Sequence, residues 1–536
     1  EVEMYRKLFV VSLALTLIIG VFATGLWAQE LAQNQVLRIA LDAQDLSMLD
    51  PHRAATTPDR VISDMVFNGL VRYKTGDISV FEPDLAVEIP QPTDGGLVWT
   101  FELKQGVMVH PWNGNPAYEL TAEDVVYSFT KAANPDRSSY AGAYVGMSFE
   151  AVGNYTVKIT LEEPLSAMLF LPKVADYAGG FIIPKVPIEA MGDDAFKTHP
   201  VGTGPFMFSK YVPMDRVVLK GNADYFRGAP ILKTVEVRYM PEVASRELGL
   251  RSGELEVVEG RREQDWVEMM GAVPGIVVDS FGPGETVTMH FNLTRDELGK
   301  KAVREAIAYA LDRNEFLAFF GDTVEALYSQ VPINYLAGGL TYPELWAAGL
   351  AYDVDREKAK DLLADAGYPN GFSMEAVTSE RASYRRVYEM IQAQLRQVGI
   401  DLQLKVVDHS TMHSMIRDDV NPIVIYIAWR PNADVFLTRF YHSDSIVVTG
   451  AKPDTNFSHY TGIDDLIETA RVQVDVDMQI ALWKEAQREL AEDLVSYPLV
   501  MLGFIFARSE KVDWGYDLKS TVALYTQVTE KTRILK

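Results

Sequence analysis

The absence of cysteine from a chain of 536 residues is the feature that most restricts how it can fold. It excludes disulfide scaffolds, thiolate zinc sites, iron–sulfur clusters, cysteine nucleophiles and a lipid-modified N-terminal cysteine. Hydrophobic burial must therefore hold the fold together, and 48% of the residues are hydrophobic. Because a single hydrophobic core stops growing at roughly 250–300 residues, we expect two or three lobes.

The first segment of the chain is typical of a secretory signal peptide. Arg6 and Lys7 precede a largely apolar stretch, residues 8–23, and Ala28 supplies a small residue for cleavage. The stretch is shorter than the roughly 20 residues that span a bilayer. We therefore expect residues 1–28 to be a signal peptide and the mature protein to be exported, without a lipid anchor. An uncleaved N-terminal anchor is the alternative.

The charge balance restricts the partners of the chain. Its formal net charge is −24, from 74 acidic and 50 basic side chains. Nucleic-acid binding depends on Lys and Arg side chains that neutralise phosphates, so this balance argues against a nucleic-acid partner. It also opposes binding to an anionic membrane surface.

Helical and strand patterns alternate along the chain, which predicts an α/β fold. Thr57 and Pro58 are typical of a helix N-cap and first helical residue. Thr121 and Asp124 form a capping-box pattern ahead of a second helix. Residues 155–161 alternate apolar and polar side chains, as a half-buried strand does.

Motifs for catalysis or cofactor binding are missing. The sequence contains no G-x-S-x-G, no H-E-x-x-H, no G-x-x-x-x-G-K-[ST] and no complete G-x-G-x-x-G. His409 and His413 would share one helix face and could bind a metal together, but no third histidine lies nearby, and a solvated helix is the simpler interpretation. The sequence therefore predicts no cofactor and no metal.

Eight segments, in order and at compatible spacing, resemble one protein family. They are LSMLDP (46–51), VFNGLV (66–71), WTFELKQGV (99–107) with His110, LTAEDVVYSF (120–129), VGTGPF (201–206), NADYFRGAP (222–230), Arg246 with SGE (252–254), and VREAIAYALDR (303–313). Together they resemble family 5 of the bacterial extracellular solute-binding proteins, the group that binds dipeptides, oligopeptides or nickel for ABC importers. The resemblance covers nearly the whole chain after the signal segment.

The resemblance implies an α/β fold of the type II periplasmic-binding-protein kind, with three lobes. Lobe I would comprise residues 29–80, 200–280 and 503–536. Lobe II, an insertion peculiar to the family, would be residues 81–199, and lobe III residues 281–502. Two crossover strands would link lobes I and III as a hinge, and the glycines near the crossings are Gly282, Gly284 and Gly503.

The resemblance also implies where the ligand binds. In peptide binders of the family, a W-x-x-D-x-x-D-P stretch carries an acid that pairs with the peptide ammonium. The matching stretch is AWRPNADVFL (428–437), which retains Trp429 and the later acid, lacks the earlier acid, and adds Arg430. The predicted ligand-binding residues are Met48, Phe281, Trp429, Arg430, Asn432 and Asp434. The alternatives are that Arg430 pairs with Asp434 or faces solvent, and that Trp429 and Met48 belong to the core.

The function implied is that of a periplasmic substrate-binding component of an ABC transporter, not an enzyme. We expect a monomer that captures a short peptide between lobes I and III and delivers it to permease subunits in the inner membrane. An oligosaccharide or another non-peptide solute is the alternative, because Arg430 favours a carboxylate or a hydroxyl over an ammonium. An exported hydrolase with paired acids and a structural surface protein are the remaining alternatives.

Overall fold

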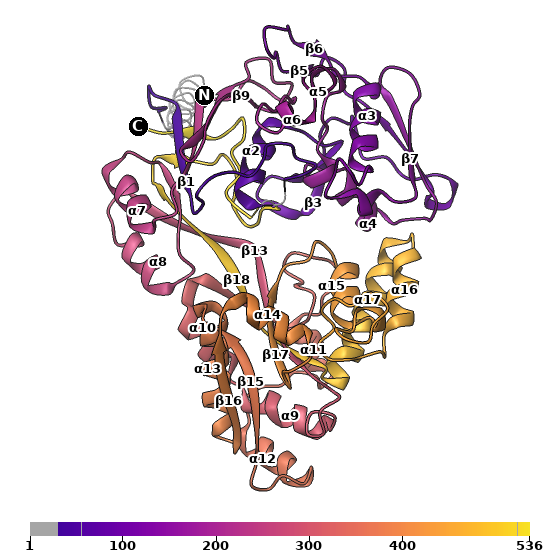
Figure 1. Cartoon of the computed structure of the whole chain (residues 1–536), viewed down its shortest axis with the longest axis vertical. Helices are drawn as coiled ribbons and strands as arrows, with labels where there is room; N and C mark the ends of the chain where they lie inside the picture. Colours follow the sequence, from indigo (N-terminus) through magenta and orange to yellow (C-terminus); the bar gives the residue numbers. More distant parts are fainter. Residues whose placement is uncertain (1–29, 55, 523) are drawn as a thin grey trace, which may run out of the picture.

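The computed structural model describes residues 30–54, 56–522 and 524–536. They form two bodies, one above the other in Figure 1. We call residues 30–280 and 503–536 the upper body and residues 281–502 the lower body. The predicted signal segment, residues 1–28, lies outside the described residues. Within them, no helix combines the length and the apolar character needed to cross a membrane.

One long sheet runs through both bodies, in the strand order β17-β13-β18-β12-β1-β11-β10-β9, with β14 also paired to β18. Strand β1 pairs in parallel with β11 and β12, and the other neighbours are antiparallel. The strands are β1 (Val36–Leu41), β9 (Phe206–Val212), β10 (Arg216–Gly221), β11 (Thr234–Tyr239), β12 (Val257–Glu259), β13 (Ile276–Phe291), β14 (Val324–Ala326), β17 (Ile423–Ala428) and β18 (Ser496–Ser509). The long strands β13 and β18 cross from one body to the other (Figure 1).

The rest of the upper body surrounds this sheet and a second one, of order β4-β8-β7. Its helices are α2 (Thr57–Val66), α3 (Ala122–Ala132), α4 (Ala167–Val174), α5 (Lys185–Met191), α6 (Asp193–Phe196), α7 (Val243–Ser252) and α8 (Gln264–Gly271). Its further strands are β2 (Val71–Lys74), β3 (Asp77–Pro83), β4 (Val98–Glu102), β5 (Met108–Val109), β6 (Tyr118–Glu119), β7 (Met147–Ala151), β8 (Thr156–Leu161), β19 (Val512–Asp513) and β20 (Arg533–Ile534).

The lower body is mainly helical around the ends of β13, β17 and β18. Its helices are α9 (Lys301–Ala310), α10 (Arg313–Phe320), α11 (Tyr342–Ala347), α12 (Arg356–Asp365), α13 (Ala382–Arg396), α14 (His409–Arg417), α15 (Ala433–Tyr441), α16 (Asp464–Val472) and α17 (Val476–Asp493). A parallel pair, β15 (Phe372–Ser379) and β16 (Ile400–Val407), completes it. The predicted α/β class is therefore confirmed.

Local sequence signals produce these elements as expected, with one shift. Thr121 and Asp124 form the predicted capping box at the start of α3. In β8 the apolar side chains are buried alternately, as the pattern of residues 155–161 predicts. At α2, however, Thr56 is the N-cap and Thr57 is already helical. The shift by one residue leaves Pro58 in the first turn, where its missing N–H has no cost.

The hydrophobic cores divide along the same line as the two bodies. One large cluster contains buried side chains from residues 37–257 and 501–534 together with Phe281 and Tyr335, so the predicted lobes I and II share a core that a few lower-body residues join. Two other clusters lie almost wholly within residues 287–502. The cores thus leave the two bodies separate, and the space between them is where a site can form.

Candidate ligand-binding cleft

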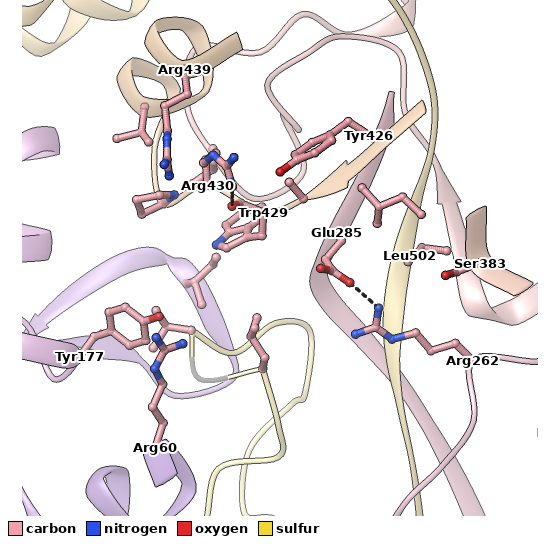
Figure 2. Close-up of a pocket in the computed structure, with 18 of the residues that line it drawn as sticks. Arg60, Tyr177, Arg262, Glu285, Ser383, Tyr426, Trp429, Arg430, Arg439 and Leu502 are labelled. Atoms are coloured by element: carbon pink, nitrogen blue, oxygen red, sulfur yellow. Dashed lines mark hydrogen bonds and ion pairs between the residues drawn. The ribbon is translucent and has the colours of Figure 1, made fainter. Parts of the chain in front are cut away.

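A cleft with a volume of about 1610 Å³ lies between the two bodies. Its upper wall includes Arg60 of α2, Lys173 of α4 and the loop of residues 260–263 that precedes α8. Its lower wall includes the start of α13 and the loop of residues 429–432 that follows β17. Figure 2 shows Arg60 and Arg262 of the upper body and Ser383, Trp429 and Arg430 of the lower body around this space. A cleft built from two bodies joined by two strands can close around a ligand.

The charge of the cleft is opposite in sign to that of the chain. The cationic residues that line it are Arg60, Lys173, Arg261, Arg262, Arg381, Arg386, Arg430 and Arg439, and the anionic ones are Asp42, Glu263, Asp265 and Glu285. Eight cations against four anions leave a net charge of +4, whereas the whole chain carries −24. The cleft therefore favours an anionic solute.

Arg430 is a cation without an ion-pair partner among the described residues. Its Nη1 donates to the carbonyl of Trp429 at 2.9 Å, and its guanidinium lies 5.0 Å from the ring centroid of Phe440. No carboxylate of the described residues lies within ion-pair distance of it, and its Nε has no hydrogen-bond partner there. Burial, followed by repulsion from Arg439, lowers the pKa of Arg430. A ligand anion would relieve both effects.

Arg60, on the opposite wall, is also incompletely hydrogen-bonded, although against the effect of burial the neighbouring Tyr177, Tyr140 and Asp59 raise its pKa. Its Nη2 donates to the hydroxyl of Tyr140 at 3.4 Å, and its guanidinium lies 5.0 Å from the ring centroid of Tyr177. Its Nε is buried and has no hydrogen-bond partner among the described residues. In Figure 2, Arg60 and Tyr177 of the upper body are in the lower part of the view, and Arg430 and Trp429 of the lower body are above them. Two incompletely bonded guanidiniums thus border one space from opposite bodies.

One ion pair already bridges the two bodies at the back of the cleft. Arg262, in the loop before α8, donates from Nη1 to Oε2 of Glu285 on β13 at 2.7 Å. The guanidinium of Arg262 also lies 4.2 Å from the ring centroid of Phe504 on β18. Both charged groups are about one-third exposed, so the pair contributes little stability by itself. Glu285 is less available to a ligand ammonium, because Arg262 is already its ion-pair partner.

The predicted hinge glycines lie where β13 and β18 change register, between Phe281 and Glu285. A Cβ at Gly284 would lie 1.0 Å from the carbonyl oxygen of Leu502, and one at Gly282 would collide with the ring of Tyr335. A Cβ at Gly503 would lie 3.1 Å from Ser280 Oγ, which is only a tight contact. Neighbouring atoms leave no room for a Cβ at positions 282 and 284, so glycine is required there whether or not these residues act as a hinge.

Three of the predicted ligand residues line the cleft. They are Trp429, Arg430 and Asn432. The ring of Trp429 packs against that of Phe436 at 5.9 Å, edge to face, and is only partly buried. Asn432 is the N-cap of α15, where its Oδ1 accepts from the amide of Val435 at 3.0 Å. Trp429 and Arg430 thus remain available to a solute, while the carbonyl of Asn432 is already used by its helix.

The other three predicted ligand residues lie away from the cleft lining. Asp434 accepts from Nε of Arg471 at 3.2 Å and is only 15% exposed, so its partner in the structure is Arg471 and not Arg430. Phe281 is 3% exposed and packs against Phe504 and Phe506 in the upper core. Met48 is half-buried, and its amide donates to Asp59 at 3.3 Å. The first turn of α15 points Asp434 toward α16, which the sequence motif does not reveal.

The histidine pair also lines the cleft. His409 and His413 share one face of α14, and their ring centroids are 4.5 Å apart. Burial, then the neighbouring His409, lowers the pKa of His413 to about 4, so its ring is neutral at pH 7. No group of three or more potential metal ligands occurs within the described part of the chain. The pair therefore offers neutral hydrogen-bonding groups beside the cationic ones.

Comparisons with known proteins fit this geometry. Residues 80–446 match the family model for the bacterial extracellular solute-binding proteins, family 5 middle. The dipeptide-binding protein of Escherichia coli K12 is 28% identical over 465 residues, covering 79% of this chain and 81% of its own. MoaA of A. tumefaciens R10, solved in complex with mannopinic acid, is 36% identical, with 94% of this chain and 100% of that chain covered and a TM-score of 0.72.

A third relative is DppA of Helicobacter pylori, a periplasmic binding protein solved with the peptide STSA. It is 26% identical, covers 95% of this chain and 99% of its own, and has a TM-score of 0.70. The predicted fold of a family 5 periplasmic binding protein is thereby confirmed, and so is a solute-binding role. The chain belongs to family 5 of the bacterial extracellular solute-binding proteins.

Proposed function

We propose that this protein binds a carboxylated small solute in the cleft and delivers it, unchanged, to an ABC permease. The observation that carries the proposal is the unpaired guanidinium of Arg430, with Arg60 opposite. A guanidinium that is partly buried without a counter-ion is costly in the free protein. A carboxylate between the two walls would receive charge-assisted hydrogen bonds from both bodies and would favour their closure.

The same charges disfavour a free peptide N-terminus. Asp434, the acid that the family motif offers to an ammonium, is paired with Arg471, and Glu285 is paired with Arg262. An ammonium in the lower half of the cleft would instead meet Arg430 and Arg439. An acidic solute such as mannopinic acid, the ligand of the 36% identical MoaA, fits the charges better.

A short peptide is the second candidate. The size of the cleft, about 1610 Å³, favours it, because a cleft of that volume accommodates an extended ligand and the waters around it. The dipeptide-binding and STSA-binding relatives support it as well. In that case the peptide's own carboxylate would be the group that Arg430 binds.

Calorimetry separates the two candidates. We expect mannopinic acid to bind tightly at one site, and neutral sugars and C-amidated dipeptides to bind weakly or not at all. Tight binding of a C-amidated dipeptide would refute the carboxylate proposal, and tight binding of free dipeptides alone would favour the peptide. Mass spectrometry of the recovered solute tests the non-catalytic role, since turnover would contradict simple capture and delivery.

Several expectations stay part of the proposal. The lobe boundaries 29–80, 200–280 and 503–536 for lobe I, 81–199 for lobe II and 281–502 for lobe III are consistent with two bodies connected by β13 and β18. A hinge at Gly282, Gly284 and Gly503 is supported by their position at the crossing. Monomeric behaviour, periplasmic export and removal of residues 1–28 complete the proposal, and light scattering and N-terminal sequencing of the exported protein test them.

A further inference from the structure

Helix α4 belongs to the upper body, but its buried side chains contribute to the hydrophobic cores of both bodies. Phe170, Leu171 and Val174 belong to the large core of the upper body. Leu169 is 7% exposed and belongs instead to a cluster whose other buried members all lie within residues 331–495 of the lower body. Figure 1 shows α4 at the base of the upper body, facing α16 and α17. One helix therefore takes part in two cores.

The residue that precedes α4 makes a polar contact with the lower body. Ser166 is the N-cap of α4, yet its hydroxyl does not cap the helix. It donates instead to Oε1 of Gln479, on α17, at 2.6 Å, and both side chains are 0% exposed. An N-cap serine ordinarily accepts a bond from its own helix. Here the Ser166 hydroxyl instead forms a hydrogen bond with a residue of the lower body.

The Gln479 side chain is oriented to receive this bond. Its Nε2 donates to the carbonyl of Ala470, at the end of α16, at 2.7 Å, and to that of Gln473 at 3.3 Å. Because the amide nitrogen is fixed by two carbonyls, Oε1 must point toward Ser166. Loss of the serine donor would leave a buried acceptor without a partner while the two bodies are in contact.

A second contact lies beside the first. Gly96 of the upper body approaches Val474, in the loop between α16 and α17, so closely that a Cβ at Gly96 would lie 2.9 Å from Cγ2 of Val474. Pro164, two residues before Ser166, borders the same spot at 3.3 Å. The two bodies therefore meet at a closely packed contact, which is apolar at Gly96 and Val474 and polar at Ser166 and Gln479.

This contact controls the position of a cleft wall. Leu169, Pro172 and Lys173 of α4 all line the cleft. We propose that the Ser166–Gln479 bond and the Gly96–Val474 contact are the means by which the lower body positions α4 as that wall. Ser166 and Gln479 are positioning residues, since neither lines the cleft. Docking of α4 onto α16 and α17, which the free structure already shows, would then be kept when the cleft captures the solute.

Two variants, each with a matched control, test the positioning. Val474→Arg places a long cation against Gly96 and should force the bodies apart, whereas Val472→Arg adds the same charge at a side chain that is already 50% exposed. Small-angle scattering should show a larger radius of gyration for Val474→Arg alone. Hydrogen exchange of the α4 amides should also be faster in that variant than in Val472→Arg. Equal scattering and exchange in the two variants would overturn the proposal.

Ser166→Ala removes only the polar bond. Its control is Ser128→Ala, because Ser128 is equally buried but bonds within the upper body, to the carbonyl of Phe181 and the amide of Ile183. We expect Ser166→Ala to speed hydrogen exchange of the α4 amides in the free protein and to weaken mannopinic acid binding roughly tenfold. Ser128→Ala should lower the melting temperature and leave the affinity unchanged. The reverse pattern would refute the role of Ser166.

The scattering and exchange measurements use the protein alone, so they do not depend on which solute it binds. If wild-type protein fails to bind mannopinic acid, the proposed solute is wrong, and the ligand-free measurements still decide whether the lower body positions α4. If Val474→Arg undocks α4 and yet binds mannopinic acid as tightly as wild type, docking does not accompany capture. That result would overturn the second half of the proposal.

Discussion

Replacement of Arg430 by methionine should have opposite effects on the free and the ligand-bound protein. Methionine keeps the packing on Phe440 and removes the charge. In the bound state, a charge-assisted hydrogen bond contributes about 1.5–3 kcal/mol. The variant should therefore bind a carboxylated solute about 10- to 150-fold more weakly. In the free state, the lost charge is one that burial and Arg439 disfavour, so the melting temperature should stay the same or rise.

Calorimetry with mannopinic acid and thermal melting without ligand measure the two effects of Arg430→Met. Arg488→Met is the control, because Arg488 is an exposed α17 residue whose partner is Glu485, away from the cleft. It should leave the affinity unchanged. Unchanged affinity in Arg430→Met would show that Arg430 binds no carboxylate. A clear fall in its melting temperature would show instead that the guanidinium stabilises the free protein.

Three other changes have definite expected outcomes. Arg60→Met should also weaken binding. If one carboxylate receives both guanidiniums, the double variant Arg60→Met/Arg430→Met should lose less binding free energy than the two single variants lose together, and a double-mutant cycle by calorimetry measures this. Burial, with Asp84 nearby, raises the pKa of Asp64 to about 6. The stability that this residue contributes to the folded protein is therefore fully present at low pH, where Asp64 is neutral, and is lost as the pH rises through 6 and Asp64 must ionise. In urea unfolding, Asp64→Asn should be more stable than wild type by about 2 kcal/mol at pH 7.5 and much less so at pH 4.5; an equal difference at both pH values would contradict this. Gly284→Ala should cost more than about 3 kcal/mol in the same assay, because its Cβ would meet the Leu502 carbonyl, whereas Gly503→Ala should cost less.

The elements could be predicted from the sequence wherever the signal is local. The capping box at Thr121 and Asp124 needs only four consecutive residues, and it starts α3 as expected. The alternation of residues 155–161 needs only a strand with one buried face, and β8 has one. At α2 two threonines precede Pro58, and both can serve as an N-cap, so the pattern could not decide between Thr56 and Thr57.

The site could be predicted only in part, because its residues come from distant segments. The family motif located Trp429 and Arg430, which do line the cleft. It could not show that α16 brings Arg471 within 3.2 Å of Asp434 and removes that acid from the cleft. Arg60 carried no signal in the sequence, since an arginine on the polar face of an amphipathic helix is ordinary. Its importance depends on Arg430, 370 residues later, facing it across the cleft.

The contrast between the chain's charge and the cleft's charge would let this acidic protein bind the carboxylated solute that we propose. Most of the 74 acidic residues lie outside the cleft lining, and salt screens exposed charges over about 8 Å. Inside the cleft, a carboxylate 4 Å from a guanidinium gains about 4 kcal/mol at the effective dielectric of a protein surface. A few unpaired cations at short range therefore outweigh a large diffuse charge of the opposite sign. The overall charge should instead slow the approach of an anionic solute, so its association rate should rise with ionic strength while binding stays tight.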